Sequence, residues 1–204
     1  MLEIETPSGA ARADLRPVAD ATGTLVLGHG AGGGIAARDL VAAADAASGL
    51  GLAVALVEQP YRVAGRRSPP PAPRLDEAWV AVVDALRKDG FIRAPLIVGG
   101  RSSGARVACR TAVATEAAGV LCLAFPLVPP PRAGGNPAPS RLPELDAVPV
   151  PTLVVQGAND RFGMPPPGPR RTVVQVRGDH SLRTDLGAIA AAVRSWLAGV
   201  VDSG

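Results

Sequence analysis

The stretch LIVGGRSSGARVA, residues 96–108, contains the pattern Gly-x-Ser-x-Gly as GRSSG at residues 100–104. An apolar run with strand character precedes the pattern, and a segment with helical character follows it. The flanking glycines suit a turn that is too tight for a side chain on either side, and such a turn exposes the hydroxyl of Ser102 at the start of the next helix. The dipole of that helix favours negative charge at its N-terminus. Ser102 is therefore the candidate nucleophile.

A serine hydroxyl needs a general base at neutral pH, and the base needs an acid that fixes its tautomer and stabilises its charged form. The chain has two histidines. His180 follows the last strand candidate, so we expect it at the same sheet edge as Ser102 and predict that it is the base. Asp160, in PTLVVQGANDRFG, follows the seventh strand candidate and is the predicted acid. Asp179 is the alternative, but adjacent side chains in an extended stretch point apart.

A second glycine-rich stretch, LGHGAGGG at residues 27–34, has two interpretations. As Gly-x-Gly-x-x-Gly after a strand it matches a dinucleotide-binding fingerprint, for which Glu58 would be the acidic partner. As a His-Gly loop it supplies an oxyanion donor. The dinucleotide interpretation leaves the candidate catalytic residues unexplained, and the single tyrosine and single lysine do not form a Tyr-x-x-x-Lys pair. We therefore predict the backbone N–H groups of Ala31 and Ser103 as oxyanion donors, with a plain tight turn as the remaining alternative. We expect no cofactor and no metal.

Short apolar runs alternate with amphipathic helical patterns along the chain, which predicts an α/β fold with a mostly parallel sheet. The first two runs are joined by TPSG, a turn signal, so they are expected to pair as an antiparallel hairpin. The eight strand candidates are residues 2–5, 11–15, 24–27, 53–57, 96–99, 119–124, 152–155 and 172–176. The apolar stripes are Trp79, Val82, Val83 and Leu86; Leu186, Ile189, Ala190, Val193 and Leu197; and, more weakly, Leu40, Val41 and Ala44.

Two proline-rich segments, residues 61–74 and 126–145, interrupt this alternation. Proline lacks the N–H donor and clashes with the preceding turn, so we expect no regular helix in them and no helical lid. Both follow strands at the edge where ligands bind in open α/β sheets, although plain solvated loops are an equal alternative. The missing lid favours small acyl groups. Arg62, Arg66 and Arg101 are candidate substrate-binding residues for an acidic group, unless they are solvated or paired with acids such as Glu58.

Composition narrows the class of protein. With 204 residues, of which 47% are hydrophobic, the chain is long enough for one domain with its own core, residues 1–204. No apolar run approaches the roughly 20 residues of a membrane span. The N-terminus lacks signal-peptide features, so a cytoplasmic protein is expected, with Cys109 and Cys122 as buried thiols.

The basic balance, a net charge of +3 and a pI near 9.5, is not read as nucleic-acid binding. The arginines are scattered, and aromatic residues make up only 3% of the chain, which leaves little material for base stacking. The expected partner is a small-molecule ester. The natural substrate and the oligomeric state stay open.

The motifs LVLGHGAGGG, GGRSSGARVA, VVQGANDRFG and GDHSL resemble those of the α/β-hydrolase superfamily. The order Ser102, Asp160, His180 is similar to that of this superfamily. More closely, together with QPYRVAGRRSPPPAPRLDEAW and AFPLVPP, they resemble a small dienelactone-hydrolase-like branch. That branch includes a testis-expressed protein and the hydrolase-like domain of a chromatin acetyltransferase complex subunit.

The resemblance covers nearly the whole chain from Thr24 onward. It implies an α/β-hydrolase fold with an eight-stranded sheet and a serine esterase with the Ser-Asp-His triad and oxyanion donors named above. Two features depart from the pattern. Dienelactone hydrolases carry a cysteine nucleophile, so their substrate does not transfer to a chain with Ser102. The interval from Asp160 to His180 is short. A weakly catalytic or non-catalytic binding module is the alternative, but such a module has no need of three catalytic residues.

Overall fold

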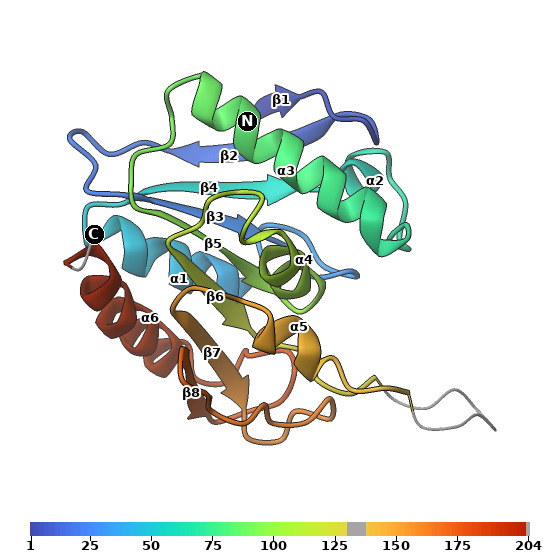
Figure 1. Ribbon diagram of the computed structural model, residues 1–204, viewed down its shortest axis with the longest axis vertical. Coiled ribbons are helices and arrows are strands. Elements are labelled where there is room, and N and C mark those ends of the chain that lie inside the picture. Colours follow the sequence, from blue (N-terminus) through green and yellow to red (C-terminus); the bar gives the residue numbers. More distant parts are fainter. Residues whose placement is uncertain (130–137, 203–204) are drawn as a thin grey trace.

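The computed structural model describes residues 1–129 and 138–202. Its centre is an eight-stranded sheet in the order β1-β2-β4-β3-β5-β6-β7-β8 (Figure 1). β1 and β2 form an antiparallel hairpin, β2 is antiparallel to β4, and the other neighbouring strands are parallel. The predicted fold class is confirmed. The strands are β1 (Leu2–Ile4), β2 (Ala11–Arg16), β3 (Thr24–Gly28), β4 (Ala53–Glu58), β5 (Leu96–Arg101), β6 (Gly119–Leu123), β7 (Thr152–Gly157) and β8 (Arg171–Val176).

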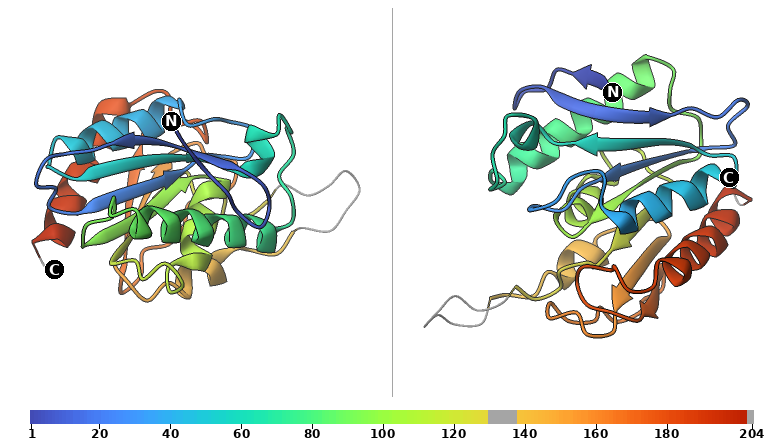
Figure 2. Two further views of the ribbon diagram at one scale, coloured as in Figure 1. Left: turned by 90° about the horizontal axis from the view of Figure 1, so that it is seen from above. Right: turned by 180° about the vertical axis from the view of Figure 1, so that it is seen from behind.

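Helices cover both faces of the sheet (Figure 2). α1 (Arg38–Ser48) and α6 (Leu186–Val201) pack on one face, and α3 (Ala72–Lys88) and α4 (Ser103–Thr111) pack on the other. The central strands are therefore buried on both sides, which explains their continuous apolar runs. Among the described residues, no helix combines the length and the apolar character needed to cross a membrane.

The apolar stripes read from the sequence are the buried faces of these helices. Trp79, Val82, Val83 and Leu86 of α3 are buried in the core on one face of the sheet. The stripe of α6 buries Ile189, Val193 and Leu197 against the opposite face, beside Leu40 of α1. Each buried large apolar side chain contributes about 1.5–3 kcal/mol, so the two stripes hold the helices on the sheet.

Three helices overlap the ends of the proline-rich segments, so the prediction that these segments hold no regular helix is wrong there. α2 (Pro60–Val63) overlaps the first segment, and α3 begins inside it at Ala72. α5 (Leu142–Asp146) begins inside the second. All three start with a proline at the first or second helical position, where the missing N–H has no intrahelical partner to lose.

The interval between β6 and β7 contains α5 as its only helix in the described part of the chain. With five residues, α5 is too short to form a helical lid. Residues 130–137 of the second proline-rich segment lie outside the described residues, so the expectation for that part is untested.

Candidate active site

Ser102 lies in the turn between β5 and α4 with φ 53° and ψ −106°, a conformation that is unfavourable for a residue with a side chain. The glycines around it explain how the turn fits. A Cβ atom at Gly100 or at Gly104 would collide with the carbonyl oxygen of Gly28 at the end of β3. The sequence pattern therefore places Ser102 where β5 and β3, both central strands, end side by side.

His180 connects Ser102 to Asp160. Its Nε2 lies 2.9 Å from Oγ of Ser102, and its Nδ1 lies 2.8 Å from Oδ2 of Asp160. The carboxylate of Asp160 is almost fully buried, with 1% of its side chain exposed, whereas 19% of the His180 side chain is exposed. The structure thus brings the three residues predicted for catalysis into one hydrogen-bonded chain with its serine end toward solvent.

Two neighbours that the sequence analysis did not single out hold the carboxylate of Asp160. Nε2 of Gln156, a fully buried residue, donates to Oδ2 at 2.9 Å, and the backbone N–H of Phe162 donates to Oδ1 at 2.9 Å. The ring of Phe162 also packs on the His180 ring, with 4.3 Å between ring centroids. The sequence did contain a signal for Gln156, because a glutamine at the end of the apolar strand TLVVQG is expected to be buried. A buried side-chain amide needs hydrogen-bond partners.

Gly157 allows the loop that carries His180 to approach the end of β7. A Cβ atom there would come within 2.8 Å of the carbonyl oxygen of Gly178 and would also meet that of Asp179. The backbone of the His180 loop therefore lies directly on β7. This close approach brings Asp160 and His180 within hydrogen-bond distance across a short sequence interval.

Asp179, the alternative acid, does not contact the ring of His180. It is exposed, and its Oδ1 accepts hydrogen bonds from the backbone N–H and the hydroxyl of Ser181. The Ser181 hydroxyl, followed by the Ser181 N–H, holds the pKa of Asp179 below its usual value. Asp179 and Ser181 therefore form a local turn, and Asp160 is the carboxylate that meets His180.

One predicted oxyanion donor, Ala31, is on the glycine loop, and the other, Ser103, follows Ser102 at the start of α4. Neither the N–H of Ala31 nor that of Ser103 has an acceptor among the described residues. The loop of Ala31 adjoins the nucleophile, since a Cβ atom at Gly30 would lie 3.6 Å from the Cβ of Ser102. Two free amides beside a serine are the arrangement that stabilises a developing oxyanion.

His29 fixes this loop from within the core. Its Nε2 accepts the backbone N–H of Gln59 at 3.0 Å, so Nδ1 carries the proton and donates to the carbonyl of Gly30 at 2.8 Å. Burial lowers the pKa of His29 and keeps the ring neutral. Tyr61, whose pKa burial raises to about 12, donates from its hydroxyl to the carbonyl of Ala31 at 3.0 Å. His29 is therefore a structural residue of the glycine loop.

Arg101 contacts two protein groups and also lines a groove beside the glycine loop, so its substrate-binding role stays a prediction. Its Nε lies 2.9 Å from Oδ2 of Asp39, whose side chain is 2% exposed, and its Nη2 donates to the carbonyl of His180 at 2.9 Å. Burial raises the pKa of Asp39 despite the opposing charge of Arg101. The guanidinium thus connects α1, the nucleophile turn and the His180 loop.

A groove of about 460 Å³ is lined by Arg101 and Ser181, the chain neighbours of Ser102 and His180, but not by Ser102, Asp160 or His180 themselves. The glycine loop, the start of α1 and the residues after His180 line it, and they include Arg38 and Arg183, which the sequence analysis did not select. Arg62 and Arg66 do not line this groove. Nη1 of Arg62 donates to the carbonyl of Arg66 at 3.4 Å. The structure therefore does not bring the three predicted substrate-binding arginines together.

Among the described residues, no group of three or more His, Cys, Asp or Glu side chains is arranged to hold a metal ion. A dinucleotide-binding interpretation of the glycine loop has no support from its contacts, because His29 and Tyr61 tie the loop to the core beside Ser102. The arrangement suits nucleophilic attack on a carbonyl carbon.

A family model described as an alpha/beta hydrolase domain matches residues 21–185. No sequence among curated proteins matches the chain significantly. Solved structures resemble it over nearly its whole length at low sequence identity, which is a likeness of fold.

Three of these structures illustrate the likeness. A lidless α/β serine hydrolase from Xanthomonas campestris is 20% identical, with a TM-score of 0.76 over 97% of this chain and 93% of the other. Est1E from Butyrivibrio proteoclasticus, with ferulic acid bound, is 15% identical, with a TM-score of 0.79 over 99% and 100%. Dienelactone hydrolase from Anabaena variabilis is 17% identical, with a TM-score of 0.74 over 97% and 95%.

Proposed function

Because the chain belongs to the alpha/beta hydrolase domain family, we propose that it is a serine hydrolase that cleaves small carboxylic esters through an acyl-enzyme. The observation that carries this proposal is the hydrogen-bonded chain from Asp160 through His180 to Ser102. The likeness to a serine hydrolase without a lid supports it as a likeness of fold.

In the first half-reaction, Oγ of Ser102 attacks the ester carbonyl and its proton passes to Nε2 of His180. The carbonyl oxygen becomes an oxyanion, which the N–H groups of Ala31 and Ser103 stabilise. When the tetrahedral intermediate collapses, the C–O bond to the alcohol breaks and His180 returns the proton to the leaving alkoxide. The alcohol departs and the acyl group stays on Ser102.

In the second half-reaction, a water molecule gives a proton to His180 and attacks the acyl carbon. The bond to Ser102 Oγ breaks, the serine regains its proton from His180, and the carboxylic acid leaves. Asp160 accepts the Nδ1–H of His180 throughout, so the ring presents Nε2 to Ser102 and its positive charge is stabilised. Gln156 and the N–H of Phe162 keep the carboxylate oriented.

A binding module without activity is the competing function. It would have no requirement for a serine, a histidine and a buried aspartate in hydrogen-bond contact, or for two free amides beside the serine. These features support the enzymatic proposal.

The test is labelling with a serine-directed fluorophosphonate, followed by identification of the modified peptide by mass spectrometry. We expect the label on Ser102. Ser102→Ala should abolish labelling and lower ester turnover by a factor of about 10⁴ or more, with the circular dichroism spectrum unchanged. Ser181→Ala, in the neighbouring turn, is the matched control and should label normally. Labelling that persists in Ser102→Ala contradicts the assignment, and a wild-type protein that neither labels nor hydrolyses esters favours the binding module.

A further inference from the structure

The peptide group that joins Gly30 to Ala31 contains the predicted oxyanion donor, because the N–H of Ala31 belongs to it. The carbonyl of the same peptide group is that of Gly30, and it accepts two hydrogen bonds. Nδ1 of His29 donates to it at 2.8 Å, and the backbone N–H of Gly33 donates to it at 3.1 Å. Both bonds therefore act on the peptide group that is expected to bind the oxyanion.

The bond from His29 sets the direction of the Ala31 N–H. The carbonyl of Gly30 points toward the ring of His29, which is 2% exposed. The C=O and N–H bonds of a planar trans peptide point in opposite directions, and this peptide is trans. The Ala31 N–H is consequently directed away from the buried ring, and it has no acceptor among the described residues. A free N–H that is turned away from the core is available to a ligand.

The same bond strengthens the Ala31 N–H as a donor. Hydrogen bonds in a chain polarise one another, by about 10–30% for each bond. The chain begins with the backbone N–H of Gln59, which donates to Nε2 of His29 at 3.0 Å. Because the ring is neutral, it accepts at one nitrogen and donates at the other. The chain then passes through the Gly30 carbonyl and ends at the Ala31 N–H.

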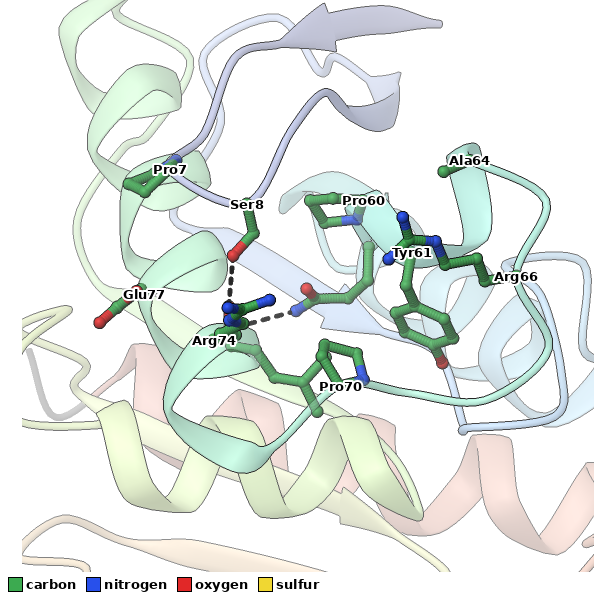
Figure 3. A pocket seen from close by; sticks show the side chains of 11 residues that line it. Pro7, Ser8, Pro60, Tyr61, Ala64, Arg66, Pro70, Arg74 and Glu77 are labelled. Atoms are coloured by element: carbon green, nitrogen blue, oxygen red, sulfur yellow. Dashed lines mark hydrogen bonds between the residues drawn. The ribbon is translucent and has the colours of Figure 1, made fainter.

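The residues that anchor this chain lie at the start of α2. Gln59 precedes α2, and its side-chain Nε2 donates to the carbonyl of Leu75 in α3 at 3.2 Å. Tyr61 of α2 lines a separate cavity of about 380 Å³ (Figure 3) and donates to the carbonyl of Ala31 at 3.0 Å. That carbonyl belongs to the peptide group between Ala31 and Gly32. His29 and Tyr61 therefore hold the same loop but act on different peptide groups.

We propose that His29 is a positioning residue for the oxyanion donor: its Nδ1–H fixes the direction of the Ala31 N–H and strengthens it as a donor. The inference rests on the proposed hydrolase function. His29 acts through the peptide group between Gly30 and Ala31 and not on the substrate itself. Its effect therefore falls on kcat, because the oxyanion forms only after the substrate has bound.

Two substitutions separate this role from a purely structural one. The amide nitrogen of asparagine lies the same number of bonds from Cα as Nδ1 of histidine, so His29→Asn keeps a donor for the Gly30 carbonyl. The amide oxygen of glutamine lies the same number of bonds from Cα as Nε2, so His29→Gln keeps an acceptor for the Gln59 N–H. His29→Gln should be the more stable variant in urea unfolding, because His29→Asn leaves the buried Gln59 N–H without a partner.

His29→Asn should nevertheless be the more active variant. With p-nitrophenyl acetate, kcat should fall about tenfold to a hundredfold in His29→Gln and about threefold or less in His29→Asn, since the loss of a whole oxyanion donor costs about 10²–10³. KM should change little in either variant. Tyr61→Phe, which removes a bond to the same loop but to another peptide group, is the matched control and should lower kcat less than His29→Gln does.

Activity that follows stability, or an equal loss of kcat in His29→Gln and Tyr61→Phe, would overturn the inference and leave the proposed function intact. A wild type without ester hydrolysis would overturn both.

A measurement on the wild type does not depend on the folding of any variant. A trifluoromethyl ketone forms a hemiketal with Ser102: Oγ adds to the carbonyl carbon, the serine proton passes to His180, and the carbonyl oxygen becomes an oxyanion. In the NMR spectrum, the amide proton of Ala31 and the Nδ1 proton of His29 should then both move downfield, because the two hydrogen bonds are coupled. A hemiketal that leaves either proton unmoved would overturn the inference.

Discussion

Nη2 of Arg101 donates a hydrogen bond to the carbonyl oxygen of His180 at 2.9 Å, so the residue before the nucleophile holds the backbone of the base. The same guanidinium is anchored through Nε to the buried carboxylate of Asp39. A residue with these two contacts sets the distance between His180 and Ser102. We infer that Arg101 is a positioning residue of the proposed hydrolase.

Arg101→Lys should therefore lower kcat by roughly tenfold to a hundredfold with a smaller effect on KM, because displacements of about 1 Å have effects of that size. Lysine keeps the positive charge beside Asp39 but lacks the planar fork that reaches both partners. Arg67→Lys, on an exposed loop, is the control, and the midpoint of thermal unfolding of each variant reports its stability. A folded Arg101→Lys protein with wild-type kcat would contradict the positioning role.

Short acyl chains should be the best substrates. The described residues between β6 and β7 provide one five-residue helix as wall, and the groove beside the glycine loop is lined largely by glycine, alanine and charged residues. A long acyl chain would gain about 0.8 kcal/mol for each CH₂ only if a pocket buried it. In a series of p-nitrophenyl esters from acetate to palmitate, kcat/KM should be highest from acetate to butyrate. A maximum at the long chains would refute this expectation.

The second expectation about the substrate is a preference for an acyl group that carries a negative charge. The structure points to arginines other than Arg62 and Arg66 for the test of this preference. Arg38 and Arg183 line the groove that Arg101 and Ser181, the chain neighbours of Ser102 and His180, also line, whereas Arg66 lines a separate cavity of about 380 Å³. The hemisuccinate ester should be cleaved faster than the butyrate ester, because a guanidinium can bind its free carboxylate. Arg183→Gln should remove the difference between the two rates. Arg66→Gln should leave the ratio of the two rates unchanged. Equal rates for the two esters in the wild type would contradict a preference for acidic acyl groups.

The sequence was sufficient to predict the fold and the residues that meet at Ser102, because these follow from local patterns. Strand runs, helical stripes and the Gly-x-Ser-x-Gly turn each depend on neighbouring residues. The role of Arg101 depends on a partner far along the chain, because its guanidinium contacts His180, which is 79 residues away. Its charge and its place before the nucleophile made Arg101 a candidate for substrate binding, and only the packed structure shows that its guanidinium contacts Asp39 and His180.

The two cysteines should be unreactive in the folded protein. Cys109 and Cys122 are buried, and their Sγ atoms are 3.5 Å apart without a disulfide, as the sequence predicted for buried thiols. The hydrogen bond from Cys109, followed by burial, raises the pKa of Cys122 well above its usual value. Because the thiolate is the reactive form, a disulfide reagent such as DTNB should react with neither thiol in the native protein and with both in denaturant. Rapid reaction of one native thiol would show that this pair is accessible.

His29 should make the protein less stable in mild acid. Burial lowers its pKa in the folded state, and its Nε2 is occupied by the N–H of Gln59, so the folded protein disfavours the charged ring. The unfolded chain has an ordinary histidine pKa near ~6.5 and binds the proton readily below that pH. Below about pH 6.5 the unfolded state therefore binds more protons, and stability falls as pH falls, by at most about 1.4 kcal/mol per pH unit for this one group. The stabilising effect is complete above that pH.

Urea unfolding at about pH 7.5 and about pH 5.5 measures this loss, a range chosen to bracket the ordinary histidine pKa. His29→Gln keeps an oxygen that can accept the Gln59 N–H but cannot be protonated, so its free energy of unfolding should fall less over the same range. His180 is the only other histidine, and a His180→Gln background removes its contribution from both proteins. If the wild type and His29→Gln lose stability equally in that background, another group controls the acid sensitivity and the neutral His29 is not its cause.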